Sequence, residues 1–128
     1  MRNILEMYGL APADDDAEVG IEIEVEGKRL NVMGLPRRWR GTGDGSLRGE
    51  GVEYVLRSPV PRGAPVRRAI SSLQEYFTNH QSIINESERA GVHIHINCQN
   101  LTEQQVLCFA LLYYTLEDVL IKFCAPHR

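Results

Sequence analysis

Acidic and imidazole side chains recur at every second position in two short segments of the chain. Residues 20–26 read Gly-Ile-Glu-Ile-Glu-Val-Glu, and residues 91–97 read Gly-Val-His-Ile-His-Ile-Asn. Because side chains alternate between the two faces of a β-strand, each segment would gather its polar groups on one face. These groups are Glu22, Glu24, Glu26, His93, His95 and Asn97. Carboxylates and imidazoles are ligands for divalent cations, so the pattern indicates metal chemistry.

The polar faces have a second interpretation that needs no metal. An amphipathic antiparallel strand often turns its charged face to solvent, and Glu22, Glu24 and Glu26 fit that description. Carboxylates about 7 Å apart repel one another, and a bound Mg²⁺ or Mn²⁺ ion would reverse that interaction. A hydrogen-bonded structural role for His93 and His95 likewise stays open beside a metal or phosphate site.

Glu53 places a further acidic side chain in another apolar segment, residues 51–55, which reads Gly-Val-Glu-Tyr-Val. A nearby arginine or a shared cation would each neutralise it. Asp44 stands in the sequence Asp-Gly-Ser, which by itself is the signal of a turn. The motifs G-x-x-x-x-G-K-[ST], H-E-x-x-H and G-x-S-x-G are all absent, which excludes a P-loop and leaves a zinc protease or serine hydrolase without support.

Length and composition indicate one globular domain. The chain has 128 residues, of which 43% are hydrophobic and 24% charged, and its formal net charge of −3 gives no indication of nucleic-acid binding. Loop arginines can clamp phosphates or carboxylates, although a solvated surface is the simpler interpretation for each one. The clustered arginines are Arg37, Arg38, Arg40, Arg48, Arg57, Arg67 and Arg68.

Cysteine usage and the absence of targeting segments indicate a cytoplasmic protein. Cys98, Cys108 and Cys124 lack C-x-x-C spacing, which argues against a zinc knuckle and against a disulfide framework. No basic segment followed by an apolar stretch marks a secretory signal at the N-terminus. The longest apolar run, residues 106–116, is too short to span a bilayer, so we expect no membrane association.

Periodicity and turn signals predict the strands that would position these residues. We expect strands over residues 20–26, 52–56 and 91–97, a hairpin tip at residues 26–28 returning through residues 29–33, an irregular loop over residues 34–51, and a polar linker over residues 80–90. A long loop inside a compact domain is usually functional or disordered.

Two helices are predicted beside these strands. Pro65 begins the first one, at a position where proline is tolerated. Its apolar stripe consists of Val66, Ala69, Ile70, Leu73 and Phe77. Thr102 and Gln105 have the spacing of a capping box for the second helix, which runs to about Phe123 and is apolar on most sides, so we expect it to be buried. The expected fold is α+β, a curved, mostly antiparallel sheet with two helices packed on one face.

Four motifs follow one another along the chain: Gly20-x-Glu22-x-Glu24, then Asp44-Gly45-Ser46, then Glu53-Tyr54-Val55 followed by Ser58-Pro59, and finally Gly91-x-His93-x-His95. In this order the chain resembles the amidoligase family, common in phage and bacterial genomes, of the glutamine synthetase and glutamate–cysteine ligase superfamily. The resemblance covers residues 19–128, with residues 1–18 as a lead-in segment. It implies part of the glutamine synthetase catalytic fold and an ATP-dependent carboxylate–amine ligase, in which an acyl phosphate forms and an amine then displaces phosphate.

The resemblance also implies site residues and cofactors. The implied metal ligands are Glu22, Glu24, Glu53 and His93, and the implied cofactors are Mg²⁺ or Mn²⁺ and ATP. His95 resembles a residue that contacts the nucleotide or its phosphates. Arg128 aligns with the start of an arginine-containing segment that reaches the phosphates in relatives, and Arg48 is a further candidate to steady the acyl phosphate. Glu26 shares the acidic face but lies near the expected hairpin tip, which makes it a weaker candidate. The implied substrates are a small-molecule or peptide carboxylate and an amine.

Members of this family continue beyond the position that corresponds to Arg128, with strands that supply another acidic ligand and basic residues. We therefore expect the chain to be the N-terminal part of a longer domain or one half of a split enzyme, with a second copy or a complementing C-terminal half as its partner. The alternative function is a non-catalytic metal-binding or assembly module that retains the fold. A metal-dependent hydrolase is a third hypothesis, for which no ligand spacing is met.

Overall fold

A computed structural model describes residues 4–9 and 18–122 of the chain. The chain divides into two compact units, residues 17–96 and residues 1–16 together with residues 97–128. The first unit holds the sheet and helix α2, and the second holds helices α1 and α3. The expected single domain over residues 19–128 stays a prediction.

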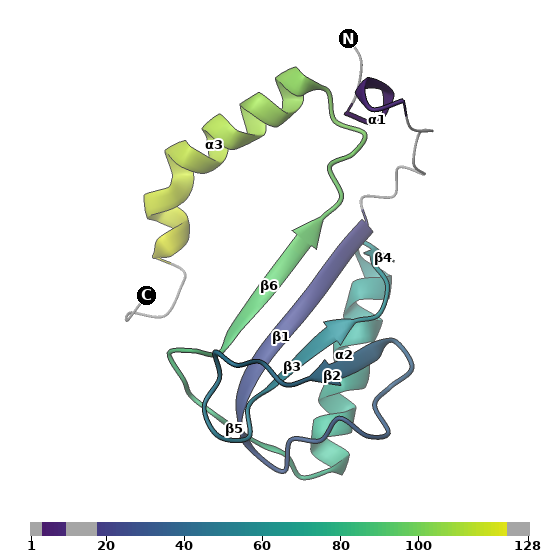
Figure 1. Cartoon of the computed structure of the whole chain (residues 1–128), viewed down its shortest axis with the longest axis vertical. Coiled ribbons are helices and arrows are strands. Elements are labelled where there is room, and N and C mark those ends of the chain that lie inside the picture. The colour runs from purple at the N-terminus through teal and green to yellow at the C-terminus, as the bar shows by residue number, and fades with distance from the viewer. Residues whose placement is uncertain (1–3, 10–17, 123–128) are drawn as a thin grey trace. The chain divides into compact units, whose positions relative to one another are not determined.

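Strand β1, Glu18–Lys28, is the centre of the first unit, because four of the other five strands pair with it (Figure 1). Those other strands are β2 (Trp39–Thr42), β3 (Val52–Leu56), β4 (Val60–Pro61), β5 (Ile83–Asn85) and β6 (Gly91–Ile96). β3 and β6 flank β1, β4 and β5 pair with its two ends, and β2 extends the sheet beyond β3. Every pairing is antiparallel, which confirms the predicted α+β fold.

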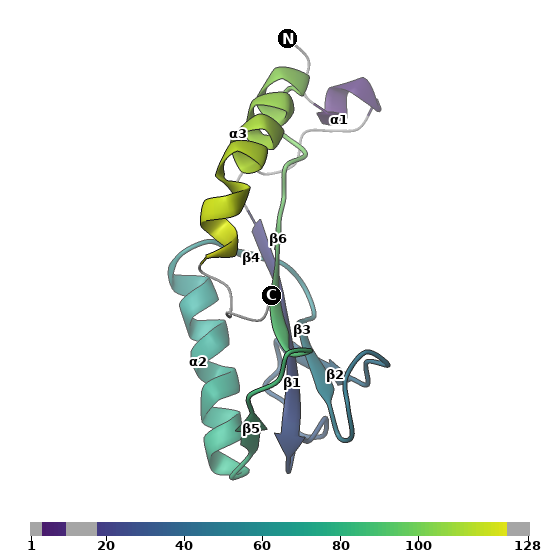
Figure 2. The same ribbon diagram turned by 90° about the vertical axis from the view of Figure 1, so that its left-hand side faces the viewer.

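Helix α2, Ala64–Asn79, covers one face of this sheet (Figure 2). Pro65 lies in its first turn, as the sequence predicts, where the missing amide hydrogen would have no helical partner. The buried residues of the helix are Ala69, Leu73 and Tyr76. Ile70 is 43% exposed, so the predicted stripe is wrong there, because position 70 is turned about 100° around the helix from position 69.

Trp39 anchors the helix to the sheet. Its side chain is fully buried, and its Nε1 donates a hydrogen bond to the carbonyl of Ala69 at 3.0 Å. Trp39 belongs to β2, inside residues 34–51, so the prediction of an irregular loop over that whole stretch is wrong. Arginines on both sides of Trp39 make this short strand read as polar in the sequence.

The predicted return of a hairpin after β1 is also wrong. Arg29 has a φ of 58°, and residues 30–33 form no strand. The hydroxyl of Tyr54 instead donates to the carbonyl of Asn31 at 3.1 Å, which satisfies a backbone group that has no ladder partner. Burial raises the pKa of Tyr54 to about 12, so the hydroxyl keeps its proton as a donor.

Strand β5 occupies the position beside the end of β1 where the hairpin return was expected. It pairs Glu26 with Asn85 and Lys28 with Ile83. The predicted polar linker over residues 80–90 therefore contains a strand. Gly27 permits this pairing, because a Cβ atom there would collide with the carbonyl oxygen of Ile83.

The second unit contains α1, Ile4–Met7, and α3, Glu103–Ile121. The predicted capping box is confirmed: the side chain of Thr102 accepts from the amide of Gln105, and the side chain of Gln105 accepts from the amide of Thr102. No residue of α3 is buried by the described residues of its own unit, so the expected burial of this helix stays a prediction. An all-round apolar surface favours burial, and the helical neighbour that the described residues of its unit offer is the short α1.

Helix α3 is long and apolar enough to cross a membrane, judged by its 19 residues and a mean hydropathy of 1.2 alone. A core helix of a soluble protein passes the same test, so this finding is weak evidence for either setting. The expected cytoplasmic location, the absence of membrane association and the packing of α3 on the sheet all stay predictions.

We predict that Trp39→Ala lowers the free energy of unfolding by about 3–5 kcal/mol, because it leaves a cavity and removes the hydrogen bond to Ala69. Trp39 is the single tryptophan of the chain, so urea unfolding should be followed by circular dichroism. Met33→Ala, at a position 73% exposed, is the matched control and should change stability by less than about 0.5 kcal/mol. Equal effects of the two substitutions would contradict the assignment of Trp39 to the core.

Candidate metal centre

The polar face of β1 lies on the side of the sheet away from the core. Glu22 is paired with Val55 of β3 and with His93 of β6. Glu24 is paired with Glu53 of β3. Directly opposed residues of antiparallel strands share a face, so β1, β3 and β6 all contribute side chains to this surface.

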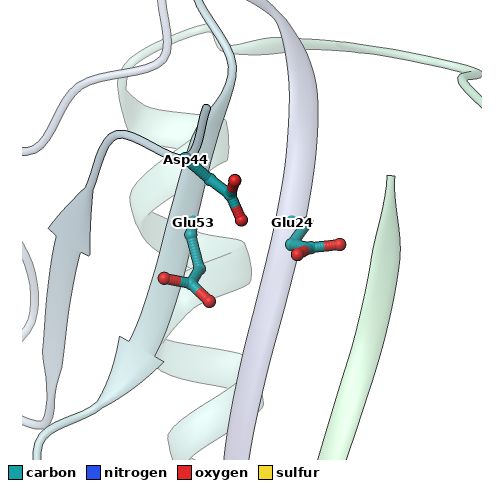
Figure 3. A group of neighbouring side chains, drawn as sticks. All are labelled: Glu24, Asp44 and Glu53. Atoms are coloured by element: carbon teal, nitrogen blue, oxygen red, sulfur yellow. The ribbon is translucent and has the colours of Figure 1, made fainter. Parts of the chain in front are cut away.

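Three carboxylates approach one another on this face (Figure 3). One oxygen from each of Glu24, Asp44 and Glu53 lies within 4.8 Å of the other two. Glu24 is buried, and Asp44 and Glu53 are partly buried. Within residues 18–122, no arginine or lysine side chain forms an ion pair with any of the three. We call this group the acidic triad.

Asp44 is the member of the acidic triad that sequence reasoning missed. Thr42 of β2 is paired with Glu53, so the chain that leaves β2 carries Asp44 past the same residue. The carboxylate of Asp44 accepts a hydrogen bond from the amide of Ser46 at 2.7 Å, which fixes its orientation and lowers its pKa. The Asp-Gly-Ser sequence was the available signal, but alone it indicates only this turn.

Two imidazoles lie against the glutamates of β1. His93 Nδ1 is 3.4 Å from Oε2 of Glu22, and His93 Nε2 is 3.7 Å from Oε2 of Glu24. His95 Nε2 is 3.4 Å from the same oxygen of Glu22, and this contact is the largest cause of the lowered pKa of Glu22. Strong charge-assisted hydrogen bonds measure about 2.7–2.9 Å, so these longer contacts leave the imidazoles able to turn toward a cation.

Glu53 experiences the opposite electrostatic environment. Burial raises its pKa, and the negative charges of Glu22, Asp44 and Glu24 raise it further. His93 partly offsets this effect. The proton on Glu53 is therefore held more tightly than usual, and a cation placed among the carboxylates would take its place.

Glu26 shares the polar face but has a different partner. Its Oε1 accepts a hydrogen bond from the backbone amide of Arg48 at 2.5 Å, which is the largest cause of its lowered pKa. Ser87 and the charges of Arg48 and Arg89 add to this effect. The Glu26 carboxylate thus holds the loop between β2 and β3, and Arg48 lies beside Glu26. The catalytic role predicted for Arg48 stays a prediction.

The residues predicted to bind metal are therefore neighbours in the structure. Glu24 and Glu53 belong to the acidic triad, and His93 contacts both Glu24 and Glu22. Their function as ligands stays a prediction. Arg128, the predicted phosphate-binding and catalytic residue, lies outside the described residues.

The acidic triad fits a hard divalent cation. Ligand oxygens around Mg²⁺, Mn²⁺ or Ca²⁺ sit about 2.0–2.6 Å from the ion, so opposite oxygens are about 4–5 Å apart. The 4.8 Å limit on the separations within the triad meets this requirement. The imidazole of His93 beside Glu24 would suit Mn²⁺ better than Mg²⁺, because nitrogen is the softer ligand.

We predict that Mn²⁺ binds the wild-type chain and that Glu24→Gln weakens this binding at least about tenfold, because the amide keeps the size of the side chain and removes its charge. Isothermal titration calorimetry measures both affinities. Glu18→Gln, on the same strand six residues away, is the matched control and should bind like the wild type. Absence of Mn²⁺ binding, or equal binding by the Glu24 variant, would exclude the site.

We also predict that Mn²⁺ binding releases a proton from Glu53. The pKa of Glu53 is raised in the metal-free chain, and a cation favours the ionised carboxylate, so affinity should rise with pH through that raised pKa. Titrations at several acidic pH values, each in two buffers of different ionisation enthalpy, measure the protons released. Glu53→Gln should release fewer protons than the wild type, and an identical count would contradict this assignment.

The chain was compared with protein-family models, curated proteins and solved structures, and no match was found in any of the three comparisons. The resemblance to the amidoligase family, which rests on four short motifs, stays a prediction.

Proposed function

We propose that the chain belongs to an ATP-dependent carboxylate–amine ligase that uses Mg²⁺ or Mn²⁺ at the acidic triad. One observation carries the proposal: Glu24, Glu53 and Asp44 come from two strands and a loop and present their carboxylates to the same small volume. His93 adds an imidazole next to Glu24. The order of motifs along the sequence is the second support.

The proposed reaction places specific demands on this surface. A substrate carboxylate attacks the γ-phosphorus of ATP, which yields an acyl phosphate and ADP, and an amine then attacks the acyl carbon and expels phosphate. A bound divalent cation would offset the negative charge that develops on the transferred phosphoryl group. In the proposal, Glu24, Asp44 and Glu53 hold such a cation. His93 lies beside Glu24, and the contact between Glu22 and His93 would fix the orientation of that imidazole.

Metal-dependent release of ADP tests this function. The chain is incubated with ATP, Mn²⁺ or Mg²⁺, amino-acid or short-peptide carboxylates, and ammonium or primary amines. We predict ADP release that requires both the carboxylate and the cation, and a rate at least about 100-fold lower in Glu53→Gln, since loss of a metal ligand removes stabilisation of the transition state. Glu18→Gln is again the control and should keep the wild-type rate.

A non-catalytic metal-binding module is the second candidate, and one observation favours it. Within residues 18–122, no arginine or lysine forms an ion pair with the acidic triad, so no described cationic side chain is held against these carboxylates, where the proposed reaction would need one for the transferred phosphate. A chain that binds Mn²⁺ through Glu24 but releases no ADP with any substrate pair would support this candidate and contradict the ligase. Hydrolysis of a phosphodiester without ATP would instead favour the hydrolase.

A further inference from the structure

We propose that the first unit carries a second binding site, for a small ligand with two or more anionic oxygen groups. This site is a surface pocket of about 480 Å³ lined by Arg37, Arg38, Arg57 and Ser58. We call it the arginine pocket. It is separate from the acidic triad, and it requires no metal, so the inference does not depend on the proposed ligase activity.

Two hydrogen bonds tie the exposed lining of the arginine pocket to the sheet. Arg57 follows β3, and its backbone amide donates to the carbonyl of Arg38 at 2.8 Å, which extends the pairing of β3 with β2. Its Nε donates to the carbonyl of Trp39 at 2.9 Å. Because Trp39 is fixed in the core, the guanidinium of Arg57 is held in one orientation while its two terminal nitrogens keep their capacity to donate.

The arginines of this pocket have no acidic partner among the described residues. Neither Arg37, Arg38 nor Arg57 forms an ion pair with a carboxylate in residues 4–9 and 18–122. Arg57 donates to the carbonyl of Trp39, much as Arg89 donates to the carbonyl of Ser46 and Arg29 to Gln81. These acceptors are neutral, so none of them supplies a counter-charge. Three adjacent positive charges without a counter-charge repel one another, and an anion would reverse that repulsion.

The chemistry of the pocket selects the class of ligand. Guanidinium groups bind carboxylates and phosphates through pairs of parallel hydrogen bonds, and three such groups match more than one anionic charge. The hydroxyl of Ser58 can both donate a hydrogen bond to an anionic ligand and accept one from it. The chain as a whole carries a net charge of −3, so its overall field does not attract anions, and saturable binding would have to come from a local cluster of basic groups such as this one.

The position of the pocket separates it from the metal chemistry. Glu53 lies in β3 and Arg57 follows the end of that strand, four residues later, so their backbones would be about 13 Å apart in an extended chain. No member of the acidic triad lines the arginine pocket. A longer anionic ligand could reach from one site toward the other along β3.

Titration with anions tests the arginine pocket. The chain is treated with chelator, dialysed free of metal, and titrated calorimetrically with inorganic pyrophosphate and, separately, with citrate. We predict saturable binding of at least one of them, weakened about tenfold in Arg57→Gln and in Arg38→Gln by loss of a charge-assisted pair. Tighter binding of pyrophosphate would assign the site to phosphate compounds, and tighter binding of citrate would assign it to polycarboxylates.

Matched variants distinguish binding in the arginine pocket from a general effect of removing one positive charge. Arg67→Gln removes the same charge on the exposed surface of α2, outside the pocket, and should change either affinity less than about twofold. Arg57→Gln also removes the side-chain hydrogen bond to Trp39 and could affect folding. Arg38→Gln is therefore the second test, because no side-chain hydrogen bond of Arg38 supports the described fold. Absence of saturable binding of both anions, or equal weakening by Arg67→Gln, would overturn the proposal.

Discussion

The alternation of side chains along β1 is the constraint on which the rest of this structure depends. The pleat that sends Ile21 and Val25 into the core beneath α2 necessarily sends Glu22, Glu24 and Glu26 to the opposite face. Pairing on both sides of β1 then prevents this strand from shifting, since a slip of one residue would bury every glutamate and expose every apolar partner. The concentration of carboxylates is therefore a consequence of core packing.

The sequence predicts best where the chemistry of the residues repeats with the period of the backbone. Strands β3 and β6 and the capping box at Thr102 were predicted from such local patterns. Strand β2 was not, because its buried residue, Trp39, stands between Arg38 and Arg40 and the strand is only four residues long. Strand β5 was missed for a related reason: its three residues are exposed, and their pairing with the end of β1 is a tertiary contact with no local signal.

The residues of the candidate site likewise fall into those that a local pattern predicts and one that depends on a tertiary contact. The alternation predicted that Glu22 and Glu24 share a face and singled out His93, and an acidic residue in an apolar segment singled out Glu53. The order of motifs implied that these residues are ligands of one metal site. The role of Asp44 depends on β2 lying beside β3, since only that pairing brings the loop to Glu53. Because β2 was not predicted, the loop had no predicted position, and its aspartate remained a turn residue.

The three glutamates of β1 show why spacing alone does not assign chemistry. Glu22 faces His93 across the β1–β6 pairing, and its carboxylate is stabilised in the ionised form by imidazoles. Glu24 faces Glu53 across the β1–β3 pairing, where like charges meet at partly buried positions and a cation would lower the energy of both.

Glu26 is opposite Asn85 of β5, and its carboxylate accepts the backbone amide of Arg48. That bond holds the loop between β2 and β3, and the same loop carries Asp44 to the acidic triad. One strand thus places three identical side chains in three different environments, and the neighbouring strand or loop decides each one. Glu26, which lies outside the acidic triad, holds the loop that brings Asp44 to Glu24 and Glu53.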